Sequence, residues 1–138
     1  LCDRHHGAGL APTVDSKERA LYLQTLVYFS NSVQNAFQLD YYPDRFADSS
    51  DYHPSAQKRG LLRLAETWQV IENQIANRSW VVGEKFSAAD IYLFMLTTWL
   101  KPDRGQPSVR RFPNVFKIGQ KVLERTSTKL VYGDFQYP

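Results

Sequence analysis

The 138-residue sequence predicts an all-α fold, a bundle built around a buried central helix. Two long segments, 15–42 and 55–76, repeat apolar residues at intervals of three and four, and no segment shows sustained strand alternation. The stretch from Ile91 to Leu100 is apolar on nearly every face, which is typical of a helix buried on all sides. The residues at its start, 86–91, contain a detailed helix-start signal.

The first predicted helix runs from about Asp15 to Tyr42. Its apolar stripe consists of Tyr22, Leu26, Phe29, Val33 and Phe37. Pro43 limits this helix, because the residue before a proline is biased away from the α conformation. The segment from Pro43 to Pro54 is rich in turn-forming residues, and we interpret it as a polar connection.

The second predicted helix runs from about Ser55 to Ala76. Its apolar stripe consists of Leu61, Leu64, Trp68, Ile71 and Ile75. Beyond the central helix, residues 101–107 have the composition of a turn. Pro113 suits the first position of a further helix that continues to about Leu123. The remaining residues, up to Pro138, predict a short helix or an irregular tail.

The start of the central helix is specified by two pairs of residues. The Ser87 hydroxyl is positioned to accept a hydrogen bond from the Asp90 amide, and the Asp90 carboxylate to accept one from the Ser87 amide, as in a capping box. Phe86 and Ile91 form the matching hydrophobic staple. The negative charge of Asp90 also suits the positive end of the helix dipole. We therefore interpret Ser87 and Asp90 as structural residues and not as catalytic ones.

Composition excludes several classes of protein. The hydrophobic fraction of 43% and the aromatic fraction of 14% are those of a globular chain, and the length fits one domain. No apolar run approaches the ~20 residues that a membrane-spanning helix needs, so we expect no membrane association. The net charge is +3, and the Lys and Arg residues are scattered along the chain. We therefore expect no nucleic-acid partner.

The N-terminal segment indicates a reducing compartment and no metal site. Cys2 is the single cysteine, so it cannot form an internal disulfide, and we expect a cytoplasmic protein. Residues 1–7 lack an initiating Met and the features of a signal peptide, so we expect the chain to begin within a longer protein. Cys2, His5 and His6 have only the distant His53 as a fourth metal ligand, so no metal is predicted. Nothing near Cys2 predicts an activated catalytic thiol.

The segment around the capping box carries a family resemblance. A Trp-Val-Val-Gly turn ends at Gly83, and Ser87 and Asp90 follow it. Gly83, Ser87 and Asp90 have the spacing that opens the buried sixth helix of the glutathione S-transferase C-terminal domain, and the segment resembles that hallmark. The resemblance covers most of the chain, from about residue 11 to residue 125. Arg125 is followed by Thr where many members of the family have Arg-Pro.

The resemblance implies a division of the chain and of its parent protein. Residues 13–138 would be the C-terminal helical domain, with five to six helices around the buried central one. Residues 1–12 would hold the end of the last helix of a thioredoxin-like N-terminal domain, followed by the interdomain linker. The features of that N-terminal domain, including its catalytic Ser, Tyr or Cys and its cis-proline segment, are not found in this sequence.

The resemblance also implies an activity for the parent protein. Members of this family attack hydrophobic electrophiles with the thiolate of glutathione, a reaction used in detoxification, and many form homodimers. The parent would use glutathione as its cosubstrate, whereas this chain would hold no cofactor and no catalytic residue. Its role would be to bind and orient the hydrophobic small molecule. We expect this chain alone to be inactive as a transferase.

The candidate substrate contacts lie on the first and the central helices and in the tail. Polar residues run along the first helix beside its apolar stripe: Tyr28, Asn31, Ser32, Asn35 and Gln38. One interpretation is a solvated or dimer-facing surface. The resemblance favours another, in which Tyr28, Asn31 and Asn35 contact the substrate in the cleft between domains. Trp99 and Tyr132 would add an apolar wall, although an aromatic residue at helical spacing also suits the core.

A second hypothesis belongs to another class. Helical domains of this kind also resemble parts of translation factors and aminoacyl-tRNA synthetase complexes, in which they serve as non-catalytic adaptors for protein assembly. The fold alone does not decide between an adaptor and a transferase. A thioredoxin-like stretch upstream of Leu1, with its nucleophile and cis-proline, would favour the transferase.

Overall fold

The computed structural model describes all residues, 1–138, and contains six α-helices and no β-strand. The helices are α1 (Arg19–Tyr28), α2 (Gln34–Tyr41), α3 (His53–Ile75), α4 (Ala88–Thr97), α5 (Pro113–Leu123) and α6 (Thr126–Tyr132). Short 3-10 turns occupy the connections between them, including Pro43–Arg45 (η3), Ser50–Tyr52 (η4) and Pro102–Arg104 (η5). The all-α prediction is confirmed.

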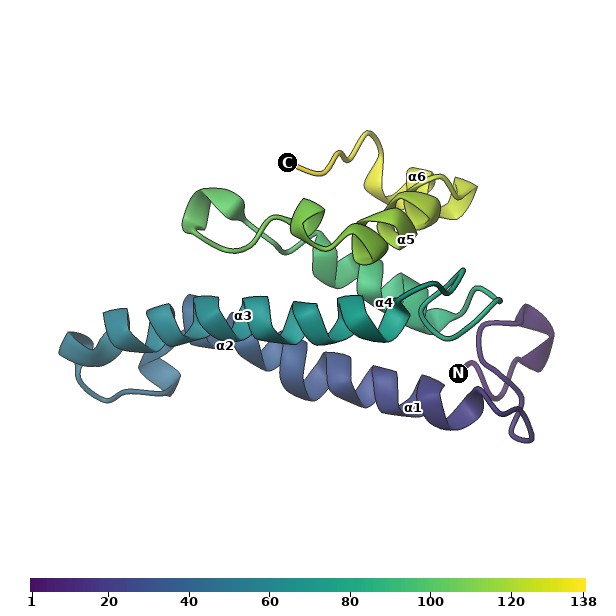
Figure 1. Cartoon of the computed structure of the whole chain (residues 1–138), viewed down its shortest axis with the longest axis horizontal. Helices are drawn as coiled ribbons and strands as arrows, with labels where there is room; N and C mark the ends of the chain where they lie inside the picture. The colour runs from purple at the N-terminus through teal and green to yellow at the C-terminus, as the bar shows by residue number, and fades with distance from the viewer.

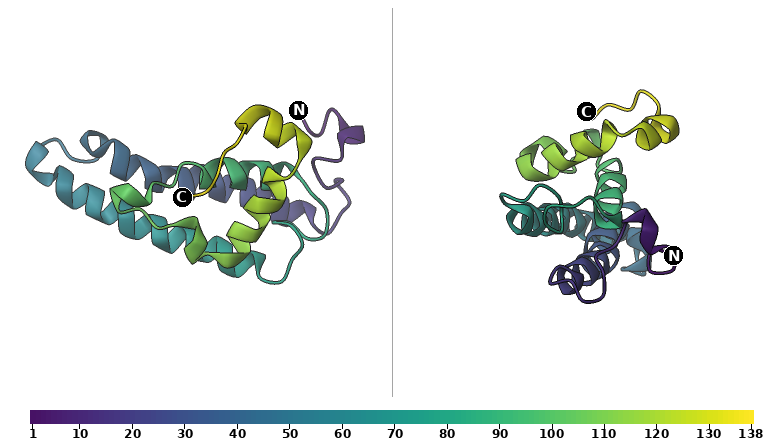
Figure 2. Two further views of the ribbon diagram at one scale, coloured as in Figure 1. Left: turned by 90° about the horizontal axis from the view of Figure 1, so that it is seen from above. Right: turned by 90° about the vertical axis from the view of Figure 1, so that its right-hand side faces the viewer.

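The helices are arranged in layers around α4 (Figures 1 and 2). Helix α3 lies alongside α1 and α2, which follow one another end to end. Helices α5 and α6 lie on the other side of α4. The central position of α4 agrees with the sequence-based prediction, and Leu93 and Phe94 at its middle are almost inaccessible to solvent. Its burial is incomplete at Ile91, which is 44% exposed, and Trp99, two residues beyond its end, is 37% exposed.

The first predicted helix is interrupted by a π-helical turn. Helix α1 begins at Arg19, because residues 13–18 form turns, and the regular α-helix gives way to π-helix over Phe29–Val33 (η2) before α2 continues to Tyr41. A π-helical turn contains one residue more than an α-helical turn, so it rotates the following residues about the helix axis. The faces of α1 and α2 therefore do not continue one another.

The start of α4 has the predicted capping box and a further bond. The Asp90 carboxylate accepts from the Ser87 amide at 2.8 Å, and the Ser87 hydroxyl also accepts from the Ala89 amide at 3.3 Å. The second Asp90 oxygen accepts from the Val81 amide at 2.9 Å. Asp90 thus holds the preceding turn as well as the helix. Gly83 closes that turn with a φ of +111°, which a side chain would disfavour.

Helix α5 begins against a carboxylate from another helix. The Glu72 side chain, on α3, accepts from the Asn114 amide at 3.0 Å and from the Val115 amide at 3.0 Å. It also accepts from the Asn114 side-chain amide at 2.6 Å. These bonds satisfy backbone groups that a helix start leaves free. The Pro113 position was predicted from the sequence, whereas this long-range cap was not.

The C-terminal tail is irregular but packed. Tyr137 is 9% exposed, and its hydroxyl shares a hydrogen bond of 2.8 Å with the hydroxyl of Thr97 on α4. Burial raises the pKa of Tyr137 to about 12, so the hydroxyl stays protonated. Gly119 on α5 leaves room for this ring, because a Cβ there would lie 2.2 Å from the Tyr137 hydroxyl.

Candidate ligand-binding groove

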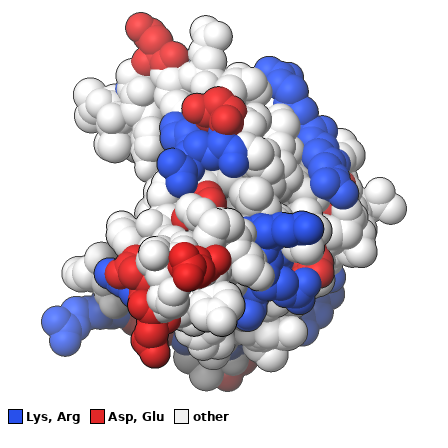
Figure 3. Space-filling model, turned by 90° about the vertical axis from the view of Figure 1, so that its left-hand side faces the viewer, with Lys and Arg blue, Asp and Glu red and all other residues white.

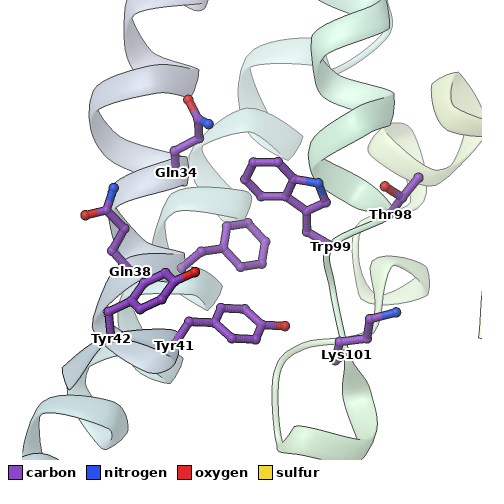
Figure 4. A pocket seen from close by; sticks show the side chains of 8 residues that line it. Gln34, Gln38, Tyr41, Tyr42, Thr98, Trp99 and Lys101 are labelled. Atoms are coloured by element: carbon purple, nitrogen blue, oxygen red, sulfur yellow. The ribbon is translucent and has the colours of Figure 1, made fainter. Parts of the chain in front are cut away.

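A groove lies between α2 and the C-terminal end of α4. Its volume is about 600 Å³. The residues that line it are Gln34, Phe37, Gln38, Tyr41, Tyr42, Thr98, Trp99 and Lys101. In Figure 4, Trp99 extends from the end of α4 toward α2, and Tyr41 extends from α2 toward the loop that carries Lys101. The amine of Lys101 points away from Tyr41.

The walls of the groove are aromatic. Phe37 contacts Trp99 edge to face, with ring centroids 5.7 Å apart, and stacks on Tyr41 at 6.5 Å. Phe37 is buried, whereas Tyr41, Tyr42 and Trp99 remain 37%, 48% and 37% exposed. Open aromatic rings around a buried one provide flat apolar surfaces for a ligand.

Polar groups at the rim of the groove are mostly engaged within the protein. The Tyr92 hydroxyl donates to the side-chain oxygen of Gln34. Burial raises the pKa of Tyr92, which keeps this hydroxyl protonated as a donor. The Thr98 hydroxyl donates to the Met95 carbonyl at 2.7 Å. The lining offers no carboxylate, imidazole or thiol for proton transfer or nucleophilic attack. The arrangement is therefore suited to binding and orientation.

The π-helical turn determines which face of α2 lines the groove. The lining residues of α2 are Gln34, Phe37, Gln38 and Tyr41, which share one helical face after the turn. A regular α-helix through residues 29–33 would present a different face to α4. Such π-helical turns are frequent at functional sites.

Trp99 lines the groove, and the other predicted contact residues lie outside it. The Tyr28 hydroxyl donates to the Thr67 carbonyl on α3 at 3.4 Å, and burial raises its pKa. Asn31 is exposed in the π-helical turn, and Asn35 is half-buried on α2. Tyr132 packs on Phe94, with ring centroids 5.0 Å apart. The role of these four residues as substrate contacts stays a prediction.

Sequence reasoning missed most of the groove. Phe37 was assigned to the core, and it is both buried and part of the lining. Tyr41, Tyr42 and Lys101 were assigned no role. The signal for this lining was the group of aromatic residues before Pro43. Phe37 and Tyr41 are four residues apart and therefore share one helical face.

The charges near the groove are unevenly distributed. Figure 3 shows the end of the molecule where η3, η4 and the loop after α4 lie, with a hollow between its upper and lower parts. Lys and Arg atoms border this hollow above, and Asp and Glu atoms gather below it.

No three His, Cys, Asp or Glu side chains are arranged to hold a metal ion. None of the helices is both long and apolar enough to cross a membrane.

Comparison with known proteins places most of the chain in one family model. Residues 41–125 match the model of the glutathione S-transferase C-terminal domain. No curated protein sequence matches the chain.

Solved structures share the fold. A glutathione transferase homolog from Sulfitobacter, with bound glutathione, has a TM-score of 0.83 and 24% identity, over 95% of this chain and 62% of that one. A sphingomonad glutathione S-transferase complexed with glutathione has a TM-score of 0.75 and 23% identity, over 94% and 60%. A glutathione transferase from Methylococcus capsulatus has a TM-score of 0.76 and 20% identity, also over 94% and 60%. The chain therefore spans about 60% of the length of these structures.

Proposed function

The chain belongs to the glutathione S-transferase family, as its C-terminal helical domain, and on that premise we propose that its groove binds the hydrophobic electrophile of a transferase. The parent enzyme would join the thiol sulfur of glutathione to that electrophile. This chain would hold the electrophile in position, and the thiolate would come from the N-terminal domain.

The observation that carries this proposal is the aromatic lining of the groove. Phe37, Tyr41, Tyr42 and Trp99 surround a volume of about 600 Å³, which is a typical size for a small-molecule site. The lining has no carboxylate, imidazole or thiol, and its open aromatic rings fit a site that binds and orients an apolar molecule. Trp99 lines this groove and is also one of the substrate contacts that the resemblance implied.

The proposed partner for catalysis is a thioredoxin-like N-terminal domain. Two of the solved structures that share the fold contain glutathione, and this chain covers about 60% of each. We infer that glutathione is the cosubstrate of the parent and that its binding groups lie outside this chain. A homodimer, a cytoplasmic location and a role in detoxification are further parts of the proposal. The helical-adaptor alternative is not favoured, because the matching structures are glutathione transferases.

A binding experiment tests the groove. The probe is 8-anilinonaphthalene-1-sulfonate, whose fluorescence rises in an apolar site, titrated against the 138-residue chain. Trp99→Ala and Tyr41→Ala should each weaken binding by about tenfold. The ligand loses the apolar surface that it buries against the removed ring, and that contact contributes ~1–2 kcal/mol to the binding free energy. Val131→Ala is the matched control, since Val131 is 76% exposed on α6, outside the groove lining. Loss of binding in the control but not in the groove variants would contradict the proposal.

An activity experiment tests the division of labour. The chain alone should not conjugate glutathione to 1-chloro-2,4-dinitrobenzene and should bind glutathione only weakly in calorimetry. Tight binding needs specific partners for two carboxylates, an amine and a thiolate, and the groove lining offers Lys101 as its one charged group. Clear turnover or micromolar glutathione binding would show that the site has been misplaced.

A further inference from the structure

We propose that a buried hydrogen-bonded tie between Asp40 and Gln106 sets the width of the groove and so selects the ligands that fit it. This inference rests on the proposed function of the groove. The Gln106 side-chain nitrogen donates to Asp40 Oδ2 at 2.6 Å. The Gln106 side-chain oxygen accepts from the Lys101 amide at 2.9 Å. Asp40 and Gln106 are 4% and 3% exposed, and neither lines the groove.

The tie joins the two walls of the groove. Asp40 directly precedes Tyr41 on the α2 wall, and the Lys101 amide lies two residues after Trp99 on the opposite wall. One side-chain amide, bonded at both of its ends, therefore holds the walls at a fixed separation. A residue that acts through others in this way is a positioning residue and not a ligand contact.

Helix α2 is the fixed side of the tie. The Gln57 side chain on α3 donates to the Asp40 carbonyl at 3.1 Å. Gly60 lets α3 approach the last turn of α2 closely, because a Cβ at residue 60 would lie 2.9 Å from the Asp40 nitrogen. The last turn of α2 is thus held from behind by α3. Loss of the tie would move the loop that follows α4, and not α2.

The loop is shaped to reach Asp40 from two positions. Gly105 has a φ of +84°, a conformation that side chains disfavour, and it turns the chain between Arg104 and Gln106. The Arg104 Nε lies 3.7 Å from Asp40 Oδ2, and its guanidinium lies 4.7 Å over the Tyr41 ring. The Arg104 side chain is 45% exposed, so water screens this ion pair. The buried amide of Gln106 therefore contributes more to the tie.

A fixed width favours small planar ligands. A ligand that touches both walls gains dispersion contacts on both of its faces, and a gap of ~1 Å on one face loses up to half of the attraction there. A narrow aromatic ligand cannot compensate when the loop moves away. A larger one still spans the wider groove. The tie should therefore favour ligands with few fused rings over ligands with many.

The experiment compares two probes that carry the same charged group, naphthalene-1-sulfonate and pyrene-1-sulfonate, by calorimetry. Gln106→Glu places a second carboxylate beside Asp40 and breaks the tie. It should weaken naphthalene-1-sulfonate binding by about tenfold, as expected for a lost hydrogen bond to a charged group, and pyrene-1-sulfonate binding by less than about twofold. The double variant Asp40→Asn with Gln106→Glu reverses donor and acceptor, and it should restore both affinities.

Each outcome supports or overturns the inference. Equal weakening of both probes, or a double variant that does not recover, would overturn it, because a general loss of stability does not change the ratio of affinities. Gln106→Leu removes both bonds without adding a charge. It should change the ratio of the two probe affinities as Gln106→Glu does, and it replaces that variant if Gln106→Glu does not fold. If neither probe binds the unmodified chain, the proposed function fails. Amide hydrogen exchange then still tests the tie, since Gln106→Leu should accelerate exchange at Lys101.

Discussion

Helices α4 and α5 both begin against a buried carboxylate, but the two carboxylates come from different distances along the chain. Asp90 caps α4 from within its first turn, three residues after Ser87. Glu72 caps α5 from α3, 42 residues before Asn114. Each carboxylate accepts two backbone hydrogen bonds and one from a side chain. The same physical need, to satisfy free amides, is thus met once by local sequence and once by tertiary packing.

The difference concerns when each helix start can form. The Asp90 cap requires only the backbone of one short segment, so it can guide α4 before the domain is assembled. The Glu72 cap exists only after α3 and α5 have packed together. We therefore expect variants of the two carboxylates to differ in the size of the stability loss and in which helix loses its protection from hydrogen exchange.

The largest expected effect is that of Asp90→Ala. The substitution leaves the buried amides of Val81 and Ser87 without acceptors, and each such group costs ~1–3 kcal/mol, so the free energy of unfolding should fall by about 3 kcal/mol. Urea denaturation followed by circular dichroism measures this. Binding of the anilinonaphthalene probe by the molecules that remain folded should not change. A loss below about 1 kcal/mol would remove the structural interpretation of Asp90.

A smaller effect is expected for Glu72→Gln. The side chain keeps its shape but has one acceptor oxygen in place of two, and its new donor group faces an amide, so the loss should be about 2 kcal/mol. Hydrogen exchange should accelerate at Asn114 and Val115 while α4 keeps its protection. Equal acceleration of exchange in both helices would contradict the view that the two caps act separately.

Ser87→Ala should cost less than either carboxylate variant. The hydroxyl satisfies the Ala89 amide and donates to Asp90 at 3.1 Å, whereas Asp90 keeps its bonds to Val81 and to the Ser87 backbone. The loss of an N-cap hydroxyl typically amounts to ~1 kcal/mol, measurable by thermal unfolding. Ser87→Thr retains the hydroxyl and is the matched control. A loss as large as that of Asp90→Ala would mean that the hydroxyl is the main cap.

The smallest expected effect is a dependence on pH. Burial raises the pKa of Asp90, and the bonds from Val81 and Ser87 oppose that shift. An acid whose pKa is raised by folding contributes stability that is complete below its unfolded pKa and is lost as the pH rises through its folded pKa. The free energy of unfolding of the unmodified chain, measured relative to that of Asp90→Asn, should therefore rise as the pH falls toward 3.8, the ordinary pKa of an Asp side chain. Unfolding in urea at several pH values measures it, and a difference that shrinks on acidification would contradict the sign.

Local patterns predicted the fold well. The spacing of Leu64, Trp68 and Ile71 gave α3, and the box at Ser87 and Asp90 gave the start of α4, because these signals act within a few residues. The π-helical turn left no comparable pattern, since Phe29–Val33 reads as a continuation of the apolar stripe. The Glu72 cap was also invisible, because its partners lie in another part of the sequence.

The groove was less predictable than the fold for a physical reason. Its lining combines one face of α2 with the end of α4 and a loop, and the π-helical turn decides which face of α2 takes part. Trp99 lies in the lining, and the resemblance implied it as part of an apolar wall, but its contact with a substrate stays a prediction. Asp40 and Gln106 could not be identified, since a buried Asp and a buried Gln become partners only through tertiary structure.

The π-helical turn has an evolutionary consequence. The π-helical turn holds one residue more than an α-helical turn, so it absorbs the rotation of about 100° that one residue of an α-helix adds. Deletion of Asn31 with return to a regular α-helix would therefore leave Phe37 and Tyr41 on nearly the face that they occupy now. The aromatic lining could thus survive the loss of a single codon within the turn.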